Sequence, residues 1–153
     1  MHALELKVPP VALAIAVALA MWLVSVFVPE LNFPLPFRLI LAIIVVAVGA
    51  GVALSGIVSF ARSKTTANPL NPESTTTLVE SGVYRFSRNP MYLGFLFVLL
   101  GWAVFLGNAL AVLMLPGFIF YMNRFQIIPE EKALFGHFGN AFSAYSKRVR
   151  RWL

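Results

Sequence analysis

Hydrophobic residues form two long runs before residue 62, Val11–Val28 and Leu39–Ala61. A helix of about 20 residues crosses the hydrocarbon core of a bilayer, so each run has roughly the length of a membrane helix. The segment between them, residues 29–36, contains three prolines, which cannot continue a helix. The first run also exceeds the apolar region of about 7 to 15 residues in a cleaved secretory signal. The pattern therefore predicts two retained membrane helices joined by a short exposed turn.

A polar stretch from Arg62 to Asn89 interrupts the apolar pattern. It holds Asn-Pro pairs at 68 and 71 and a Ser-Thr cluster at 74–77, which are typical of turns and loops. We expect this segment to lie outside the membrane.

Two shorter apolar runs follow, Met91–Leu106 and Ala109–Tyr121, separated only by Gly107 and Asn108. So short a link between two helices makes them antiparallel neighbours. The two runs are therefore expected to form a helical hairpin. Together with the first two runs, they predict an all-α integral-membrane protein with four transmembrane helices.

Beyond Asn123 and Arg124 the pattern becomes amphipathic. Apolar side chains recur at helical spacing and basic side chains lie between them: Leu134, Phe138, Phe142, Tyr145 and Val149 against Lys132, Lys147, Arg148 and Arg150. Helices of this kind lie in the plane of the membrane interface. We expect an interfacial amphipathic tail that is broken near Gly136 or Gly139.

The composition excludes a water-soluble globule. Hydrophobic residues make up 59% of the 153 residues and charged residues 12%, and the mean hydropathy is +0.83. Soluble domains are about 25% charged, and a chain this small cannot hide so much apolar surface inside itself. There is also no cysteine, which removes disulfides, thiolate metal sites and cysteine nucleophiles.

Lysine and arginine are distributed unevenly across the predicted helices. Of the 12 in the chain, only Arg38 falls on the side of the first turn and the hairpin link, and the other eleven fall on the opposite side. Basic residues accumulate on the cytoplasmic side of membrane proteins. We therefore predict that both termini, the long loop and the tail are cytoplasmic, in an inner or plasma membrane. Anionic headgroups account for the net charge of +6, so no nucleic-acid partner is expected.

No acidic or basic residue lies inside the four apolar runs, which argues against a proton-coupled transporter. Small residues recur along one face of two of these runs: Ala47, Gly51, Ser55 and Ser59 in the second, and Gly94 and Gly101 in the third. Such stripes let a neighbouring helix approach closely. We expect helix packing at the second run and at Gly101, whereas Gly94 could contact either a helix or a ligand.

Polar chemistry is concentrated in two motifs at the predicted cytoplasmic rim. The first contains Arg88-Asn89-Pro90 and Tyr92, and the second contains Pro129-Glu130-Glu131. Asn before Pro, and Pro before two Glu, are each typical of a helix start, so both motifs could be helix caps alone. The hairpin, however, returns the chain to its starting side and can bring Asn89 near Glu130.

These motifs resemble those of the integral-membrane methyltransferases that include isoprenylcysteine carboxyl methyltransferase and the phospholipid N-methyltransferases. The matching pieces are, in order, residues 88–94, residues 129–134 and the tail from Phe138-Gly139 to Arg151-Trp152-Leu153. The resemblance covers roughly Gly82 to the C-terminus. Residues 1–61 are then expected to form two N-terminal membrane helices, and residues 62–153 the methyltransferase core. Two positions depart from the family pattern: Asn89 stands where many members have His, and Phe142 where Tyr is common.

The resemblance implies that S-adenosylmethionine binds between the ends of the C-terminal helices and the tail. Its chemistry suits the available residues, because its carboxylate needs a cation or a helix N-terminus, its ammonium and ribose hydroxyls need carboxylates, and its adenine can stack on an aromatic ring. Methyl transfer needs positioning and exclusion of water, so we expect no metal. The candidate cofactor-binding residues are Arg88, Asn89, Tyr92, Gly94, Glu130, Glu131 and Phe138.

The methyl acceptor is expected to be lipidic. An amine must lose a proton before attack, whereas a carboxyl group with a pKa near ~3.5 is already ionised. The rim offers His137 as its only clear base, and Arg124 could orient an anion. We therefore favour a carboxylate acceptor such as a prenylcysteine, with Arg124 and His137 as candidate catalytic residues. A phospholipid N-methyltransferase, a lipid-modifying reductase with a nicotinamide cofactor, and a non-enzymatic four-helix scaffold or channel remain alternatives.

Overall fold

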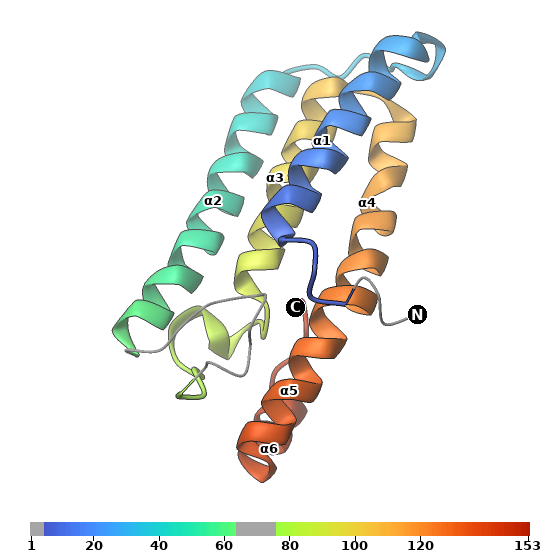
Figure 1. Ribbon diagram of the computed structural model, residues 1–153. Coiled ribbons are helices and arrows are strands. Elements are labelled where there is room, and N and C mark those ends of the chain that lie inside the picture. Colours follow the sequence, from blue (N-terminus) through green and yellow to red (C-terminus); the bar gives the residue numbers. More distant parts are fainter. Residues whose placement is uncertain (1–4, 64–75) are drawn as a thin grey trace.

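The computed structural model describes residues 5–63 and 76–153, whose regular elements are helices (Figure 1). The longer ones are α1 (Pro10–Phe27), α2 (Arg38–Arg62), α3 (Pro90–Leu106), α4 (Ala109–Tyr121), α5 (Ile128–Phe138) and α6 (Asn140–Arg148). Three short elements are the 3₁₀ turns η1 (Pro29–Leu31) and η3 (Gly82–Arg85) and the π-helical turn η4 (Met122–Ile127). Within the described ranges the one extended pairing is an isolated bridge between Asn32 and Asn108.

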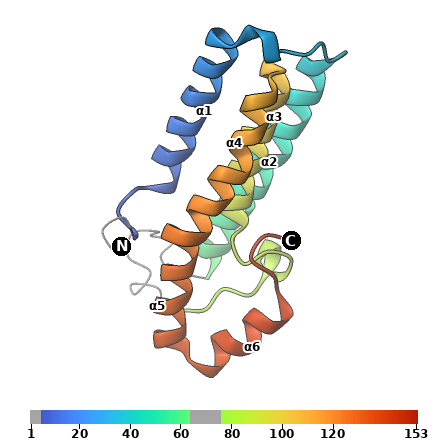
Figure 2. The same cartoon turned by 90° about the vertical axis from the view of Figure 1, so that its right-hand side faces the viewer.

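Helices α1 to α4 run side by side, and α3 is the central one (Figures 1 and 2). It packs along α2 and also contacts α1 and α4, while α1 contacts α4. The α1–α2 link and the α3–α4 link lie at one end of the bundle, and α5 and α6 extend from the other end. We call this second end the rim.

Within the described part of the chain, three helices are long and apolar enough to cross a membrane: α1, α2, and a continuous helix over residues 109–138. Helix α3 is also apolar but has 17 residues, or about 26 Å at 1.5 Å per residue. Many large apolar side chains of α1 and α2 are exposed, as expected for a surface in contact with lipid, among them Ile15, Leu19, Ile43, Ile44 and Leu54. The all-helical fold with helices of membrane-spanning length is confirmed over the described residues, and the fourth crossing stays a prediction.

The α2–α3 contact depends on glycines, but not on those that the second run suggested. A Cβ atom on Gly49 would lie 2.8 Å from the carbonyl oxygen of Gly94, and one on Gly94 would lie 2.6 Å from that of Gly49. Gly101 likewise leaves only 3.0 Å between an added Cβ and the carbonyl of Ala42. Ala42, Gly49 and Gly56 are the buried residues of α2.

The predicted stripe at Ala47, Gly51, Ser55 and Ser59 is therefore wrong as the main packing face. Ala47 and Gly51 are exposed, and an added Cβ on Gly51 would meet no atom within 4 Å. The hydroxyls of Ser55 and Ser59 donate to carbonyls of their own helix.

A buried asparagine joins the two links at the end opposite the rim. The side-chain oxygen of Asn108 accepts from the backbone N–H groups of Leu110 and Ala111 and so caps α4. Its side-chain nitrogen donates to the carbonyl of Val28 at 3.1 Å and to the side-chain oxygen of Asn32 at 2.7 Å. All its polar atoms are thus paired, which a fully buried amide requires.

The tail differs in part from its predicted form. The helix does not end at Tyr121 but continues through η4 into α5, and α5 projects beyond α2 and α3 (Figure 1). The break falls at Gly139, which has a φ of 51° and separates α5 from α6. Part of the predicted polar loop, residues 64–75 with the Asn-Pro pairs at 68 and 71, lies outside the described residues.

The α2–α3 contact gives a matched pair of substitutions. Gly49→Ala places a methyl group against backbone and should lower stability by about 1–3 kcal/mol. Gly51→Ala points into open space and should raise stability by up to about 1 kcal/mol through helix propensity. Thermal unfolding of the purified variants in detergent measures both, and a Gly49→Ala variant as stable as Gly51→Ala would contradict the contact.

Candidate functional site at the rim

A tyrosine, a glutamine and a glutamate meet where α3 begins and η4 gives way to α5. The Tyr92 hydroxyl donates to Oε1 of Glu130 at 2.5 Å, and Nε2 of Gln126 donates to the same oxygen at 2.6 Å. Tyr92 and Gln126 are buried, at 5% and 3% exposure, and Glu130 is partly buried. The hairpin thus brings Tyr92, two residues after Pro90, into contact with Glu130, the residue after Pro129.

The neighbouring glutamate is held by two arginines. Nη2 of Arg88 lies 2.6 Å from Oε1 of Glu131, and Nη2 of Arg151 lies 2.7 Å from Oε2. Nε of Arg151 donates to both carboxylate oxygens, at 3.0 and 3.1 Å. We call these three residues the ion triad. The hydrogen bonds from Arg151 to Glu131 raise the pKa of Arg151 further above its already high value, so its guanidinium group remains charged.

The Arg88 side chain has one unused donor. Its Nη1 donates to the carbonyl of Ser146 at 2.8 Å, while Nε is buried without a hydrogen-bond partner among the residues that the structure describes. A buried polar atom of this kind needs an explanation, such as a ligand or water.

The C-terminal segment, residues 149–153, closes over the start of α3. The carbonyl of Arg151 accepts from the Ser87 hydroxyl and from the Asn89 side chain, at 3.2 and 3.0 Å. The backbone N–H of Arg88 donates to the carbonyl of Arg150 at 2.9 Å. The indole of Trp152 donates to the side-chain oxygen of Asn123 in η4 at 3.1 Å.

Neither rim motif acts as a simple helix cap. Asn89 occupies the N-cap position of α3, but its side chain makes no capping hydrogen bond and binds the C-terminal segment instead. Glu130 and Glu131 lie in the first turn of α5, yet α5 continues directly from η4 and has no free N-terminus. The helix dipole therefore does not explain these carboxylates, because its positive end requires unpaired N–H groups.

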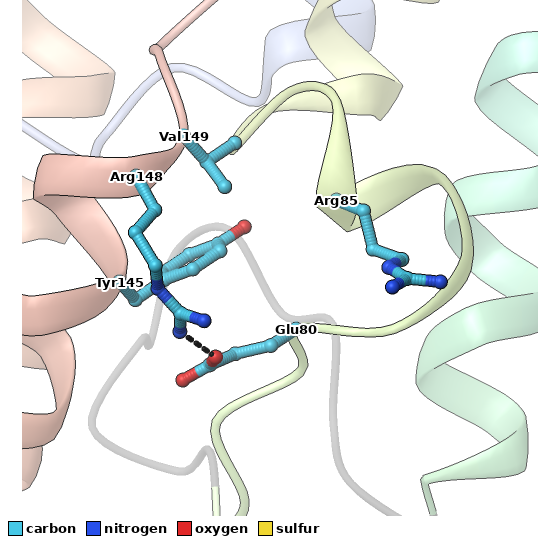
Figure 3. A pocket seen from close by; sticks show the side chains of 5 residues that line it. All are labelled: Glu80, Arg85, Tyr145, Arg148 and Val149. Atoms are coloured by element: carbon cyan, nitrogen blue, oxygen red, sulfur yellow. Dashed lines mark hydrogen bonds and ion pairs between the residues drawn. The ribbon is translucent and has the colours of Figure 1, made fainter.

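Helix α6 is anchored beside the triad by a hydrogen bond from a tyrosine. The Tyr145 hydroxyl donates to the carbonyl of Tyr84 in η3 at 2.8 Å, and burial raises the pKa of this phenol above its ordinary value, so it stays protonated. Tyr145 also lines an open pocket of about 170 Å³ together with Glu80, Arg85, Arg148 and Val149 (Figure 3). In that pocket Arg148 pairs with Glu80 at 2.6 Å.

The structure brings together five of the nine predicted site residues: Arg88, Asn89, Tyr92, Glu130 and Glu131. Gly94 instead lies in the α2–α3 contact. Phe138 packs beside Phe142, Tyr145 and Val149, and the exposed His137 meets its ring edge-on. Arg124 pairs with Glu5 of the N-terminal segment at 2.9 Å.

Gln126, Arg151 and Ser87 belong to the cluster but were not among the predicted site residues. Gln126 carries a usable signal, because it is an amide within the apolar stretch 125–128 and precedes Glu130 by one helical turn. Arg151 gives no such signal, since its position depends on how the chain returns after Gly139.

We expect a local loss of structure when the carboxylate of the ion triad is removed. Glu131→Ala leaves Arg88, whose side chain is 12% exposed, without its partner and should cost about 1.5–3 kcal/mol. Glu80→Ala removes the more exposed Arg148 pair and should cost less than about 1 kcal/mol. Thermal unfolding and limited proteolysis should show earlier unfolding and faster C-terminal cleavage for Glu131→Ala only. Equal behaviour of the two variants would argue against the triad.

Comparisons with known proteins place the rim residues within a described family. A family model described as phospholipid methyltransferase matches residues 37–141. An uncharacterized protein of Haemophilus influenzae is 48% identical over 63 residues, which are 41% of this chain and all of that protein.

Two yeast proteins named protein-S-isoprenylcysteine O-methyltransferase are also similar. The one from Schizosaccharomyces pombe is 33% identical over 72 residues, or 47% of this chain and 30% of that protein. The one from Saccharomyces cerevisiae is 38% identical over 80 residues, or 50% of this chain and 32% of that protein. The matched region therefore spans about a third of each yeast protein.

The family match extends further toward the N-terminus than the motifs suggested, since it includes α2 as well as the hairpin and α5. It contains Arg88, Tyr92, Glu130 and Glu131, while Arg151 lies beyond it. Because the match covers more than half of the chain, and the chain forms apolar helices of membrane-spanning length, this protein belongs to the phospholipid methyltransferase family of membrane methyltransferases.

Proposed function

We propose that this protein transfers a methyl group from S-adenosylmethionine to a lipidic acceptor at the rim of its helix bundle. The observation that carries the proposal is that the rim holds both Glu130, oriented by two neutral donors, and Arg88, whose buried Nε has no hydrogen-bond partner among the described residues. A zwitterionic ligand needs such an anion and such a cation close together. Membership of a methyltransferase family supports the same reaction.

The residues present fit the cofactor. Arg88 would bind its carboxylate through the unused Nε, and Glu130 would accept hydrogen bonds from its ammonium or ribose hydroxyls. When bound, the cofactor supplies a methyl group on a positively charged sulfur. The protein's own task is then to hold donor and acceptor in line and to exclude water, which the apolar bundle beside the rim favours.

Glu131 receives a different role from the one expected at first. Two guanidinium groups already neutralise it, so we assign it to holding Arg88 and the C-terminal segment in place. Asn89 assists by binding the carbonyl of Arg151, and Tyr92 by binding Glu130. Phe138 remains a candidate for stacking on adenine, whereas we assign Gly94 to helix packing.

For the acceptor we favour a carboxylate of the prenylcysteine kind. The two yeast relatives are named for O-methylation of isoprenylcysteine. Arg124 would orient the anion, although in this structure it pairs with Glu5 and would have to exchange partners. The second candidate is N-methylation of a phospholipid, which the family's description favours and for which His137 would be the base.

We further propose four membrane crossings with the rim and both termini in the cytoplasm. The links Pro29–Phe37 and Gly107–Asn108 contain no Lys or Arg, and Arg38 is the only basic residue near that end. A reporter fused at residue 33 should give a periplasmic or external signal. A reporter fused at residue 153 should give a cytoplasmic signal. A C-terminal reporter on the outside would overturn the four-helix arrangement.

The cofactor assignment predicts a large effect of a small substitution. Glu130→Gln removes a charge that hydrogen bonds to the ligand, worth about 1.5–3 kcal/mol, and should raise the Kd of S-adenosylhomocysteine by about 10- to 150-fold. Glu80→Gln is the matched control and should leave this Kd unchanged. Calorimetric titration in detergent measures both, with NADPH as the competing ligand. Tight binding of NADPH but not of S-adenosylhomocysteine would favour a reductase.

The acceptor choice is tested by methyl transfer from labelled cofactor to N-acetyl-farnesylcysteine or phosphatidylethanolamine. We expect labelling of the farnesylcysteine, lowered at least tenfold by Arg124→Ala through loss of a charged hydrogen bond and unchanged by His137→Ala. Labelling of the amine lipid alone, abolished by His137→Ala and insensitive to Arg124→Ala, would select phospholipid N-methylation instead.

A further inference from the structure

Gln126 is a buried amide at the one place where the long helix departs from regular α geometry. Its side chain is 3% exposed, and it lies within the π-helical turn η4 between α4 and α5. Buried polar side chains require partners, and π-helical turns occur frequently at functional sites. Neither the family match nor the sequence motifs assign it a role.

The buried face of the long helix continues into the π turn. The buried positions of α4 and the start of η4 are Ala111, Leu115, Phe118 and Met122, at steps of four, three and four residues. Gln126 and Ile127 are buried in turn, whereas Phe125 is half-buried. The buried face therefore advances by four residues from Met122 to Gln126, within the π turn.

That advance sets the register of the site. Gln126 and Glu130 are four residues apart and therefore lie on the same face of successive turns. Both reach Tyr92 of α3: Nε2 of Gln126 lies 3.5 Å from the Tyr92 hydroxyl, and Glu130 accepts from that hydroxyl.

The two donors hold one carboxylate oxygen and leave the other available. Oε1 of Glu130 accepts from Tyr92 and from Gln126. Over residues 5–63 and 76–153 no protein donor bonds to Oε2 of this carboxylate. A phenol and an amide orient a carboxylate without neutralising it, in contrast to the two arginines on Glu131. The second oxygen of Glu130 therefore stays available to hydrogen-bond donors of a ligand.

We propose that Gln126 is a positioning residue that fixes Glu130 so that its second oxygen receives the hydrogen-bond donors of the cofactor. This proposal rests on the proposed function, because it assumes that Glu130 contacts the cofactor. Gln126 itself acts through Glu130, and both residues contact Tyr92.

The test is a double-mutant cycle on the binding of S-adenosylhomocysteine to the full-length protein in detergent. The variants are Gln126→Met, which keeps the length of the side chain, Glu130→Gln, and the two combined. We expect Gln126→Met to raise the Kd about tenfold in the parent and less than about twofold when Glu130 is already Gln. Tyr92→Phe removes the other donor to Oε1 and should give a similar loss that also depends on Glu130.

A control separates positioning from general destabilisation. Asn32→Ala removes an amide at the opposite end of the bundle, where Asn32 pairs with Asn108, and should lower the Tm without changing the Kd. A tenfold loss from Gln126→Met in both backgrounds would show that Gln126 acts by packing and would overturn the proposal. Parent-like binding by Gln126→Met would overturn it too, whereas a parent protein that binds no S-adenosylhomocysteine would contradict the proposed function itself.

Discussion

The ion triad of Arg88, Glu131 and Arg151 is the constraint on which the rest of the rim depends. It joins the start of α3, the first turn of α5 and the C-terminal segment, which are far apart in the sequence. Arg88 and Glu131 have side chains only 12% and 17% exposed, so neither charge can be left without its partner at low cost. Once the triad is formed, the residue of α5 that precedes Glu131 lies beside the first turn of α3. Glu130 and Tyr92 then meet as a consequence.

The two consecutive glutamates therefore have different roles. Glu131 is neutralised by arginines and joins three segments of the chain, whereas Glu130 is oriented by uncharged donors and is the carboxylate that we propose for the ligand. The hairpin and the glycine contact between α2 and α3 hold this arrangement at one end of an apolar bundle. In the proposed reaction, a soluble cofactor and a lipid-borne acceptor would meet at the boundary between membrane and water, which agrees with the concentration of polar residues at the rim.

The long apolar helices could be read from the sequence, because length and composition suffice to define them. Predicted bounds of Val11–Val28 and Leu39–Ala61 compare with observed helices at Pro10–Phe27 and Arg38–Arg62. The packing face of α2 could not be read from the sequence, because a helix that is apolar all round gives no periodic signal. Within α2, Gly49 and Gly51 differ only in their surroundings, because Gly49 faces the backbone of α3 and Gly51 faces no other atom of the part of the chain that the structure describes. The pairing of the two rim motifs followed from the hairpin, but the π turn at Gln126 and the return of Arg151 depend on tertiary contacts that have no local signature.

Hydrogen exchange of the purified protein with and without S-adenosylhomocysteine tests the location of the cofactor site most directly. Slower exchange is expected in residues 84–92, 122–131 and 149–153, which form the rim, because the ligand would stabilise the contacts between them. The α1–α2 link around Asn32 serves as the internal reference and should exchange at the same rate in both states. Protection confined to that link, or binding without any protection of residues 122–131, would contradict the account.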